Sequence, residues 1–447
     1  MKETISIFGL GKVGCSLLAC FAAKGWSTIG VDIDESTITR LKNGISPIFE
    51  PHIQDLLSDN NERIIVTHDY EYAILNSDIS FIILPTPSLQ DGSFSLEILL
   101  SALKRISDIL ISKEQFHLLV ITSTVLPGDM NIISTFLEAT TKKKLGQNLG
   151  LCYNPDFIAL GNVVHNLYSP DIILIGESDN RSGRMLEDIY KRFVENKPEI
   201  FRMNFHNAEV TKIGINSFCT MKITFANMIA EICEKLPEGD ADVVTNAIGA
   251  DSRIGVQYLK PGLGYGGPCF PRDNKALHFL LKKLSSKTDL PLRIENLNIY
   301  YKKNRIPDLI YNSLNKFGLK QISILGITYK SDTDFLEDSA VIDIINRLID
   351  NGIDIKIYDP SGYNNLSSEL KESKRITFSD SALNCIKNTS MCLLATPWRE
   401  FRELRQEDFI RSMINPVIID AWNFYSFENT TDIIRIRIGK NSDKADD

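Results

Sequence analysis

The chain has 447 residues, a formal net charge of −8 and eight cysteines that lie far apart from one another. This length predicts two or three domains, each with a core of its own. The charge disfavours a nucleic-acid partner, and no apolar run is long enough for a membrane-spanning helix. Scattered cysteines without C-x-x-C pairs indicate reduced thiols and a cytoplasmic location, and six separate histidines predict no metal site.

The first predicted strand, Thr4–Phe8, leads into the sequence Gly9-Leu-Gly-Lys-Val-Gly14. A helix, 15–24, and a second strand, 27–31, follow and end at Asp32. This order is the dinucleotide-binding fingerprint, in which a diphosphate lies at the helix N-terminus and the acid binds the ribose hydroxyls. Ile33 and Asp34 stand where an NADP site would have arginine, so the predicted cofactor is NAD. The predicted contacts are Gly9, Gly11, Lys12, Val13, Gly14 and Asp32.

The rest of the chain repeats the alternation of apolar strands and amphipathic helices. It predicts an α/β fold with two Rossmann-like, doubly wound parallel sheets, joined by a long central helix and a helical middle region. The further predicted strands are 80–84, 118–121, 149–153 and 172–175 in the first sheet, and 322–325, 355–358, 391–395 and 417–419 in the second. The predicted domains are 1–205, 206–305 and 306–440, followed by a polar tail, 441–447.

Polar residues follow three of the predicted strands of the first sheet. They are Pro85 with Thr86, Thr124 and Asp156. Ligands bind at the carboxyl ends of such strands, so each could contact a cofactor or substrate. Strand caps and turns explain the same residues without any ligand, and the residues alone leave both interpretations open.

The segment Gly262-Leu-Gly-Tyr-Gly-Gly-Pro-Cys-Phe-Pro-Arg-Asp273 is the most informative part of the chain. Its glycines allow a backbone that lies against a ligand, and a helix is predicted to start near Pro271. Cys269 then precedes a helix N-terminus, where the thiolate is favoured, and one helical turn could bring Asp273 close to the sulfur. A glycine turn with a buried cysteine is the alternative.

The long central helix, predicted over 208–235, carries Lys212 and Asn216 one turn apart. Its otherwise apolar surroundings favour a lysine placed for proton transfer or oxyanion stabilisation over a solvated helix face. A nicotinamide cofactor, a nucleophilic cysteine, a lysine and carboxylates are the groups that oxidation of an alcohol to an acid requires.

From residue 4 to about 425 the chain resembles the UDP-glucose/GDP-mannose dehydrogenases, which oxidise C6 of a nucleotide-linked hexose to a uronate with two NAD. The resemblance rests on the motifs above and on Ser46-Pro-Ile-Phe-Glu-Pro51, Gly249-Ala-Asp-Ser-Arg-Ile-Gly255 and Lys330-Ser-Asp-Thr-Asp334. It implies a homodimer built on the central helix, a nucleotide-sugar substrate, with a UDP-sugar favoured, and a role in supplying polysaccharide precursors.

The resemblance also implies roles for single residues. Cys269 is the nucleophile, Lys212 and Asp273 handle the alcohol proton and the oxyanion, and Asp156 is the base of thioester hydrolysis. Thr124 and Asn216 position water or hexose. Arg253 reaches the substrate across a dimer interface. Further cofactor contacts are Pro85, Thr86 and Thr124. The implied substrate contacts are Phe157, Lys212, Asn216, Arg253, Tyr258, Lys260, Gly264, Tyr265, Gly266 and Lys330.

Several positions depart from the family pattern. Asp156 replaces a glutamate, and Leu160 replaces a second glutamate of the same motif. Glu337 and Trp422 each stand where relatives have arginine, and Pro268 replaces serine. The expectation is that the catalytic residues are kept while ligand recognition is altered. Two alternatives stay open: a two-electron NAD dehydrogenase acting on a small alcohol or acid, and a nucleotide-sugar-binding protein with little turnover.

Overall fold

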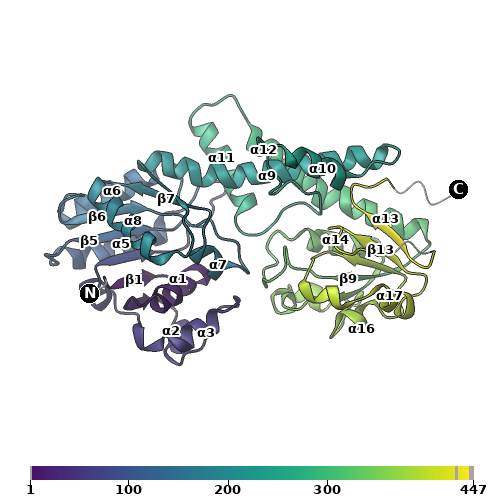
Figure 1. The fold of residues 1–447 in the computed structure, drawn as a ribbon, viewed down its shortest axis with the longest axis horizontal. Helices are drawn as coiled ribbons and strands as arrows, with labels where there is room; N and C mark the ends of the chain where they lie inside the picture. The colour runs from purple at the N-terminus through teal and green to yellow at the C-terminus, as the bar shows by residue number, and fades with distance from the viewer. Residues whose placement is uncertain (1–2, 428–430, 442–447) are drawn as a thin grey trace. The chain divides into compact units, whose positions relative to one another are not determined.

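The protein is described by a computed structural model over residues 3–427 and 431–441. Most of the predicted polar tail, residues 442–447, lies outside the described residues. The chain divides into two compact units, one formed by 1–214 with 282–285 and the other by 215–281 with 286–447. Helix α9 (Phe205–Lys235) begins in the first unit and continues in the second (Figure 1). The predicted division into three domains is not tested by this result and stays a prediction.

The first unit contains one sheet in the order β3-β2-β1-β4-β5-β6-β7-β8. Its strands are β1 (Ile5–Phe8), β2 (Thr28–Val31), β3 (Ile64–Thr67), β4 (Ile79–Ile82), β5 (His117–Ile121), β6 (Leu149–Tyr153), β7 (Ile172–Glu177) and β8 (Glu199–Met203). Its helices are α1 (Lys12–Ala23), α2 (Glu35–Lys42), α3 (Ile53–Asp59), α4 (Tyr70–Leu75), α5 (Glu97–Leu110), α6 (Asp129–Thr141), α7 (Val163–Tyr168) and α8 (Asn180–Phe193), with a 3₁₀ turn at Asn61–Arg63.

This sheet differs from the expected parallel arrangement at one junction. Strand β6 pairs with β7 in the antiparallel sense, through Cys152 with Glu177 and Tyr153 with Gly176. Strand β8 is parallel to β7, so the last two strands run against the first six. The reason is the connection 154–171. It leaves β6 and enters β7 at the same end of the strands, so it makes no crossover.

The second unit contains a fully parallel sheet in the order β11-β10-β9-β12-β13-β14. Its strands are β9 (Gln321–Leu325), β10 (Asp354–Tyr358), β11 (Ile376–Phe378), β12 (Met391–Leu394), β13 (Val417–Asp420) and β14 (Ile434–Arg437). Its helices are the later part of α9, α10 (Ala241–Ala250), α11 (Phe270–Lys283) except its last two residues, α12 (Leu290–Tyr300), α13 (Ile306–Lys316), α14 (Ala340–Asp350), α15 (Ser368–Lys371), α16 (Ala382–Ile386) and α17 (Gln406–Ser412). A π-helical turn, Tyr301–Arg305, joins α12 to α13, and 3₁₀ turns lie at Gly362–Asn365 and Arg399–Glu403.

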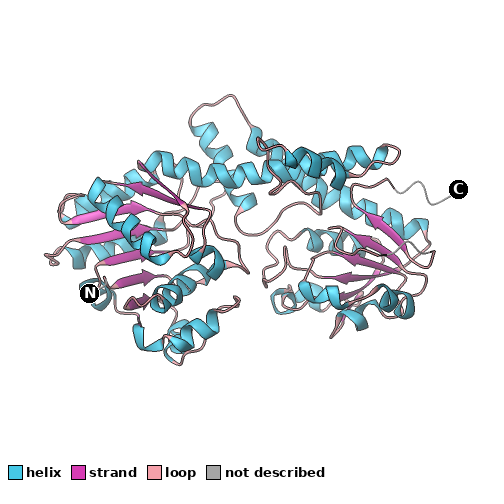
Figure 2. Cartoon of the chain, viewed as in Figure 1, coloured by secondary structure: helices cyan, strands magenta, loops and turns pink. Residues whose placement is uncertain are grey.

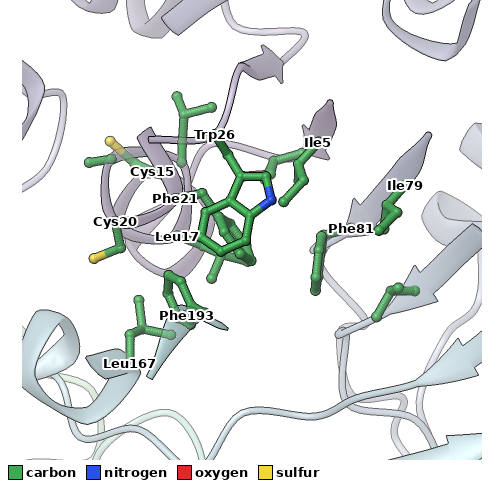
Figure 3. Packing of buried hydrophobic residues seen from close by; sticks show 14 of the residues in the cluster. Ile5, Cys15, Leu17, Cys20, Phe21, Trp26, Ile79, Phe81, Leu167 and Phe193 are labelled. Atoms are coloured by element: carbon green, nitrogen blue, oxygen red, sulfur yellow. The ribbon is translucent and has the colours of Figure 1, made fainter. Parts of the chain in front are cut away.

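The two faces of the first sheet bury separate cores, which confirms the doubly wound α/β class (Figure 2). Ile5 and Ile7 of β1 point into one core, and Phe8 points into the other, as the alternation of a strand requires. In the first core Phe21 of α1 packs against Phe193 and Trp26, with ring centroids 4.4 Å and 5.5 Å apart (Figure 3). This packing fixes α1, and so its N-terminus, against β1.

Four strands, β3, β8, β11 and β14, are absent from the sequence prediction. All four lie at the edges of their sheets, and each is only partly buried. Edge strands lack the continuous apolar run of a central parallel strand, so the pattern that reveals the others is missing. No helix of the described residues is both long and apolar enough to cross a membrane.

Candidate active site

The turn between β1 and α1 uses its three glycines for different purposes. Gly9 has a φ of +94°, and a Cβ there would lie 2.3 Å from the carbonyl oxygen of Ile83. A Cβ on Gly14 would lie 1.9 Å from the carbonyl oxygen of Gly9. A Cβ on Gly11 would meet nothing within 4 Å, and Gly11 caps α1 without any side-chain hydrogen bond. Gly9 and Gly14 are therefore required by packing, whereas Gly11 leaves the N-terminus of α1, with Lys12 and Val13, open to an anion.

Asp32, at the end of β2, is oriented by the same turn. Its Oδ2 accepts a hydrogen bond of 2.6 Å from the Leu10 amide, and its Oδ1 accepts one of 2.9 Å from the Asp34 amide. Each oxygen keeps a second lone pair, which a ribose hydroxyl can use. The open helix N-terminus at Gly11 can hold a diphosphate, and Asp32 can hold the hydroxyls of a ribose. Together they fit the adenosine diphosphate half of NAD. The Asp34 carboxylate caps α2, and hydrogen bonds from Ser36 and Thr37 lower its pKa to about 2.

The loops after β4 and β5 are linked to each other. Thr86 Oγ1 donates a hydrogen bond of 2.7 Å to the carbonyl oxygen of Thr124. Ser123 Oγ accepts from the Leu84 amide at 2.8 Å and donates to the Leu84 carbonyl at 2.7 Å. Thr86 is buried, and its hydroxyl proton is used in this hydrogen bond. Its side chain therefore holds together the two loops that follow β4 and β5. Direct ligand contacts by Pro85, Thr86 and Thr124 stay predictions.

Asp156 and Lys212 meet in the loop after β6. The Lys212 ammonium, which is buried, donates to the carbonyl oxygen of Asp156 and lies 4.7 Å from the ring centroid of Phe157. Burial of the Asp156 carboxyl raises its pKa to about 7, against the opposing effect of the Lys212 charge. Asp156 is one of the residues that line a cavity of about 30 Å³, together with Asn154, Tyr190 and others. That volume is the space of one water molecule. The loop thus presents a carboxyl group that can hold or accept a proton near neutral pH.

Glu50 holds this loop in place. The sequence analysis identified the motif that contains Glu50, residues 46–51, but did not predict this role. Its buried carboxylate accepts hydrogen bonds from the amides of Gly161 at 3.0 Å and Val163 at 2.7 Å. These amides open α7, so the acid also complements the helix N-terminus. Leu160 is half-buried and packs against the core cluster that contains Phe21 and Trp26. Its apolar side chain is accommodated by this contact.

The glycine–cysteine loop, residues 262–269, belongs to the second unit and is held closely by its neighbours. A Cβ on Gly266 would lie 2.2 Å from the carbonyl oxygen of Asp338, and one on Gly262 would lie 2.5 Å from the ring of Trp422. Asn298 of α12 binds the Tyr265 backbone twice, accepting from its amide at 3.0 Å and donating to its carbonyl at 3.0 Å. The loop backbone is therefore fixed by packing and hydrogen bonds before any ligand binds.

Cys269 ends this loop immediately before α11, and its carbonyl accepts the first helical hydrogen bond, 2.8 Å, from the Asp273 amide. It is the one exposed cysteine; Cys219 is half-buried and the other six are buried. Burial raises the pKa of the Cys15 and Cys20 thiols to about 12, which makes such thiols unreactive. The alternative of a buried cysteine in a glycine turn is therefore wrong for Cys269.

Asp273 and Asn216 are in contact within the second unit. Asn216 Nδ2 donates a hydrogen bond of 2.6 Å to Asp273 Oδ2, and Asp273 is almost fully buried. Arg272 Nε lies 3.4 Å from the other carboxylate oxygen. The sequence predicted Asn216 and Asp273 as site residues, and the fold brings these two together. A pairing of Asp273 with Lys212 of the first unit stays a prediction.

The predicted substrate contacts of the second unit have different surroundings. Arg253 is exposed and binds Asp251 at 2.6 Å, and Lys260 and Tyr258 are also exposed. Lys330 is half-buried, with its ammonium 5.9 Å from the Tyr329 ring centroid.

The side chain of Tyr265 is buried and has an internal role. Its hydroxyl donates to Glu295 at 2.8 Å and accepts from Asn274 at 3.0 Å. A contact of Tyr265, Gly264 or Gly266 with a substrate would therefore come from the backbone.

Trp422 fills the position where an arginine was expected. Its indole Nε1 donates a hydrogen bond of 2.8 Å to the Ala395 carbonyl, and its ring lies against Gly262. A small cavity beside it is lined by the glycine loop, Thr328, Tyr329 and Ser339, among others. Glu337 accepts a hydrogen bond of 2.9 Å from the Gly267 amide through its backbone, a contact that does not depend on its side chain. Over the described ranges, no group of His, Cys, Asp or Glu has the arrangement of a metal site.

A dinucleotide-binding turn in the first sheet, a fixed glycine–cysteine loop and a second parallel sheet are the features of a nicotinamide-dependent dehydrogenase. The chain matches the NAD binding domain of the UDP-glucose/GDP-mannose dehydrogenase family over residues 3–194, its central domain over 206–300 and its UDP binding domain over 323–427. The chain belongs to this family, which confirms the resemblance seen in its motifs, and its cofactor is NAD.

Similar proteins include UDP-glucose 6-dehydrogenases from two organisms. AglM of Haloferax volcanii is 34% identical over 93% of this chain and 96% of its own length. TuaD of Bacillus subtilis is 31% identical over 96% of this chain and 90% of its own length. The solved structure of a UDP-glucose dehydrogenase from Pyrobaculum islandicum superposes with a TM-score of 0.85 at 25% identity, covering 98% of both chains.

Gly11 and Gly14 of the cofactor turn provide a matched test. Gly11→Ala should fold normally, because its Cβ meets nothing within 4 Å, yet weaken NAD binding at least about tenfold by occupying the diphosphate space. Gly14→Ala should lower the free energy of unfolding by about 1–3 kcal/mol, since its Cβ overlaps the Gly9 carbonyl. Thermal unfolding and calorimetric NAD titration measure both effects. Unchanged NAD affinity in Gly11→Ala would contradict the assignment of this turn.

Proposed function

We propose that the protein oxidises the C6 hydroxyl of a nucleotide-linked hexose, favoured to be a UDP-sugar, to the uronate in a four-electron reaction. The observation that carries this proposal is the single exposed cysteine, Cys269, on a fixed loop before α11. Relatives named UDP-glucose 6-dehydrogenase, at 34% and 31% identity over nearly the whole chain, support the same reaction. A simple two-electron dehydrogenase has no use for a nucleophilic thiol.

The first oxidation needs a group to take the alcohol proton and a charge to stabilise the oxygen. We assign these tasks to Lys212 and Asp273, with Asn216 orienting the Asp273 carboxylate through their 2.6 Å hydrogen bond. The resulting aldehyde carbon is attacked by the Cys269 thiolate, a C–S bond forms, and the oxygen carries the negative charge of a thiohemiacetal. NAD, when bound, accepts the hydride of each oxidation. The thiolate is favoured by the position of Cys269 at the N-terminus of α11.

The second oxidation converts the thiohemiacetal into a thioester on Cys269, and water must then release the acid. We assign the base to Asp156, whose pKa of about 7 allows it to accept a proton at neutral pH. Water loses a proton to Asp156 and adds to the thioester carbon, the C–S bond breaks, and sulfur leaves as thiolate. The water-sized cavity beside Asp156 supports this role.

The altered recognition residues favour a second candidate, a nucleotide-sugar-binding protein with little turnover. Trp422 occupies an arginine position and packs on Gly262, and Leu160 replaces an acid with an apolar contact. Neither change touches Cys269, Asp273 or Lys212, so turnover with an unusual sugar remains the first proposal. A cytoplasmic location is kept as part of it, supported by eight cysteines of which none forms a disulfide.

The reaction is tested by counting NADH formed, at 340 nm, against sugar consumed for a panel of UDP- and GDP-hexoses. Two NADH per sugar are expected, with a uronate as product. Cys269→Ser should reduce uronate formation more than about a hundredfold, because its hydroxyl is a much weaker nucleophile. Cys219→Ser, at a half-buried cysteine, is the matched control and should retain activity. One NADH per sugar would favour the two-electron dehydrogenase, and tight sugar binding without NADH would favour the binding protein.

The role of Asp156 predicts a pH dependence. Because burial raises its pKa to about 7, the ionised base should become populated as the pH rises through 7, and thioester hydrolysis should accelerate to a plateau. Asp156→Asn should abolish this rise and leave an acyl group on Cys269. Rapid-quench mass spectrometry of a single turnover detects that adduct, and Asp156→Glu should restore hydrolysis in part. A hydrolysis rate that does not change over roughly one pH unit on either side of 7 would exclude Asp156 as the base.

We further propose that two copies associate through α9 and α10. Large apolar side chains on α9, Phe218, Phe225, Met228 and Ile232, recur at helical spacing and are 41–57% exposed. Val243 of α10 is 67% exposed. An apolar helical stripe of this kind is typical of a surface that another protein chain covers.

This association is tested by light scattering coupled to size exclusion. The unaltered protein should elute with twice the chain mass, and Phe225→Asp with Met228→Asp should shift it toward the monomer by placing charges in the apolar contact. Ile111→Asp removes an equally exposed apolar residue, directly after the last residue of α5, and should leave the mass unchanged. A monomeric unaltered protein at micromolar concentration would refute the proposed dimer.

A further inference from the structure

The second sheet repeats the geometry of the cofactor turn of the first. Gly326 follows β9 with a φ of +88°, as Gly9 follows β1 with a φ of +94°. Asp359 follows β10 as Asp32 follows β2, and its Oδ2 accepts from the Ile327 amide at 2.7 Å, as Asp32 accepts from the Leu10 amide at 2.6 Å. The two sheets therefore place a carboxylate at the same point relative to the first crossover.

The second turn nevertheless differs in the features that bind a diphosphate. Helix α14 begins only at Ala340, so residues 327–339 form a loop where the first sheet has a glycine turn and an immediate helix N-terminus. The Asp359 carboxylate is also occupied: the amides of Ser361 and Gly362 donate at 2.9 Å and 2.6 Å, and the Trp398 indole donates at 3.2 Å. This site consequently has neither a phosphate cradle nor a carboxylate that is available for a ribose diol.

A cavity of about 320 Å³ lies at the carboxyl ends of β9, β10 and β11. It is lined by Ile327, Ile357, Asp359, Tyr363, Phe378, Ser379 and Asp380. The size is at the lower end of the range for small-molecule pockets. Isoleucine side chains and the rings of Tyr363 and Phe378, whose centroids are 4.8 Å apart at 76°, give it apolar and aromatic walls. Such walls suit a planar ring system.

The charge of this cavity limits its ligand further. Its lining includes two acids and no basic residue. Asp380 Oδ1 accepts from Asn384 at 2.7 Å, whereas Oδ2 receives no hydrogen bond from the described residues. Hydrogen bonds from Asn384 and Ser381 hold the pKa of Asp380 below its usual range, so it is an acceptor at neutral pH. The Lys371 ammonium lies 5.3 Å from the Tyr363 ring centroid, outside the lining, and donates a hydrogen bond of 2.9 Å to the Asn364 carbonyl. The two lining acids therefore disfavour a phosphate and favour an amine or hydroxyl donor.

We propose that this cavity is a second, separate binding site for an uncharged nucleoside of the adenosine type. Its base would lie between the isoleucines and the aromatic rings, and its exocyclic amine or hydroxyls would donate to Asp380 and Ser379. The cavity beside the glycine loop and Trp422 shares no lining residue with it, so the proposed site is distinct from the expected position of the sugar nucleotide. The proposal does not depend on the proposed oxidation.

The test is equilibrium dialysis of radiolabelled adenosine with the full-length protein in the presence of saturating NAD, which blocks the first nucleotide site. One adenosine per chain should bind, and AMP should bind at least about tenfold more weakly because of the acidic lining. Ser379→Phe, which fills the cavity, should lower adenosine affinity at least about tenfold. Ser368→Phe, at an exposed position of α15 outside the lining, is the control and should bind adenosine normally.

Three results would each overturn the proposal. They are the absence of adenosine binding under saturating NAD, equal affinities for adenosine and AMP, and unchanged binding by Ser379→Phe. Displacement of adenosine by added UDP would be a fourth such result, because the cavity would then belong to the sugar-nucleotide site. Ser379 lies in the second unit, so a thermal unfolding curve and a near-ultraviolet circular dichroism spectrum like those of the unaltered protein verify that this unit of Ser379→Phe is folded. Loss of uronate formation alone would leave the adenosine result unaffected.

Discussion

Close backbone packing around Gly266 is the constraint on which the chemistry of this protein depends. No side chain fits there, since a Cβ would lie 2.2 Å from the Asp338 carbonyl. Asn298 then holds the neighbouring Tyr265 backbone from both sides, and Asn227 accepts from the Gly262 amide at 2.9 Å. Cys269 therefore leaves the loop in one position, at the N-terminus of α11. The proposed nucleophile is therefore ordered before any ligand binds, and such pre-organisation lowers the barrier of a covalent step.

The loop that carries Asp156 shows a related design with different groups. Its backbone is held by two buried charged side chains. The Glu50 carboxylate accepts hydrogen bonds from two backbone amides, and the Lys212 ammonium donates one to a backbone carbonyl. The Asp156 carboxyl is then left in a low-dielectric place, and its raised pKa follows from that burial. The proposed role of Asp156 as a base is supported by the water-sized cavity that this residue lines. Position and proton affinity are thus set by one packing arrangement.

The comparison of the two sheets explains why the same fold can serve different ligands. Both place a glycine and an acid at the first crossover, but only the first follows them with an immediate helix N-terminus. In the second sheet Trp398 and four backbone amides occupy the acid, which becomes part of the framework. The recognition of phosphate therefore depends on the helix start and on open backbone amides, which the strand order alone does not provide.

The sequence by itself determined the fold class, the NAD fingerprint at Gly9–Asp32 and the helix start after Cys269. These features are written in local patterns: buried parallel strands are continuous apolar runs, and glycine, proline and acid positions fix turns. Only the tertiary structure decided the rest. It shows that β7 and β8 reverse direction, adds four edge strands, and joins Asn216 to Asp273 and Glu50 to Gly161. Such features depend on contacts between residues that are far apart in the chain, and no local sequence pattern specifies those partners. Edge strands, buried hydrogen bonds and the burial of a carboxyl group are properties of the packed fold.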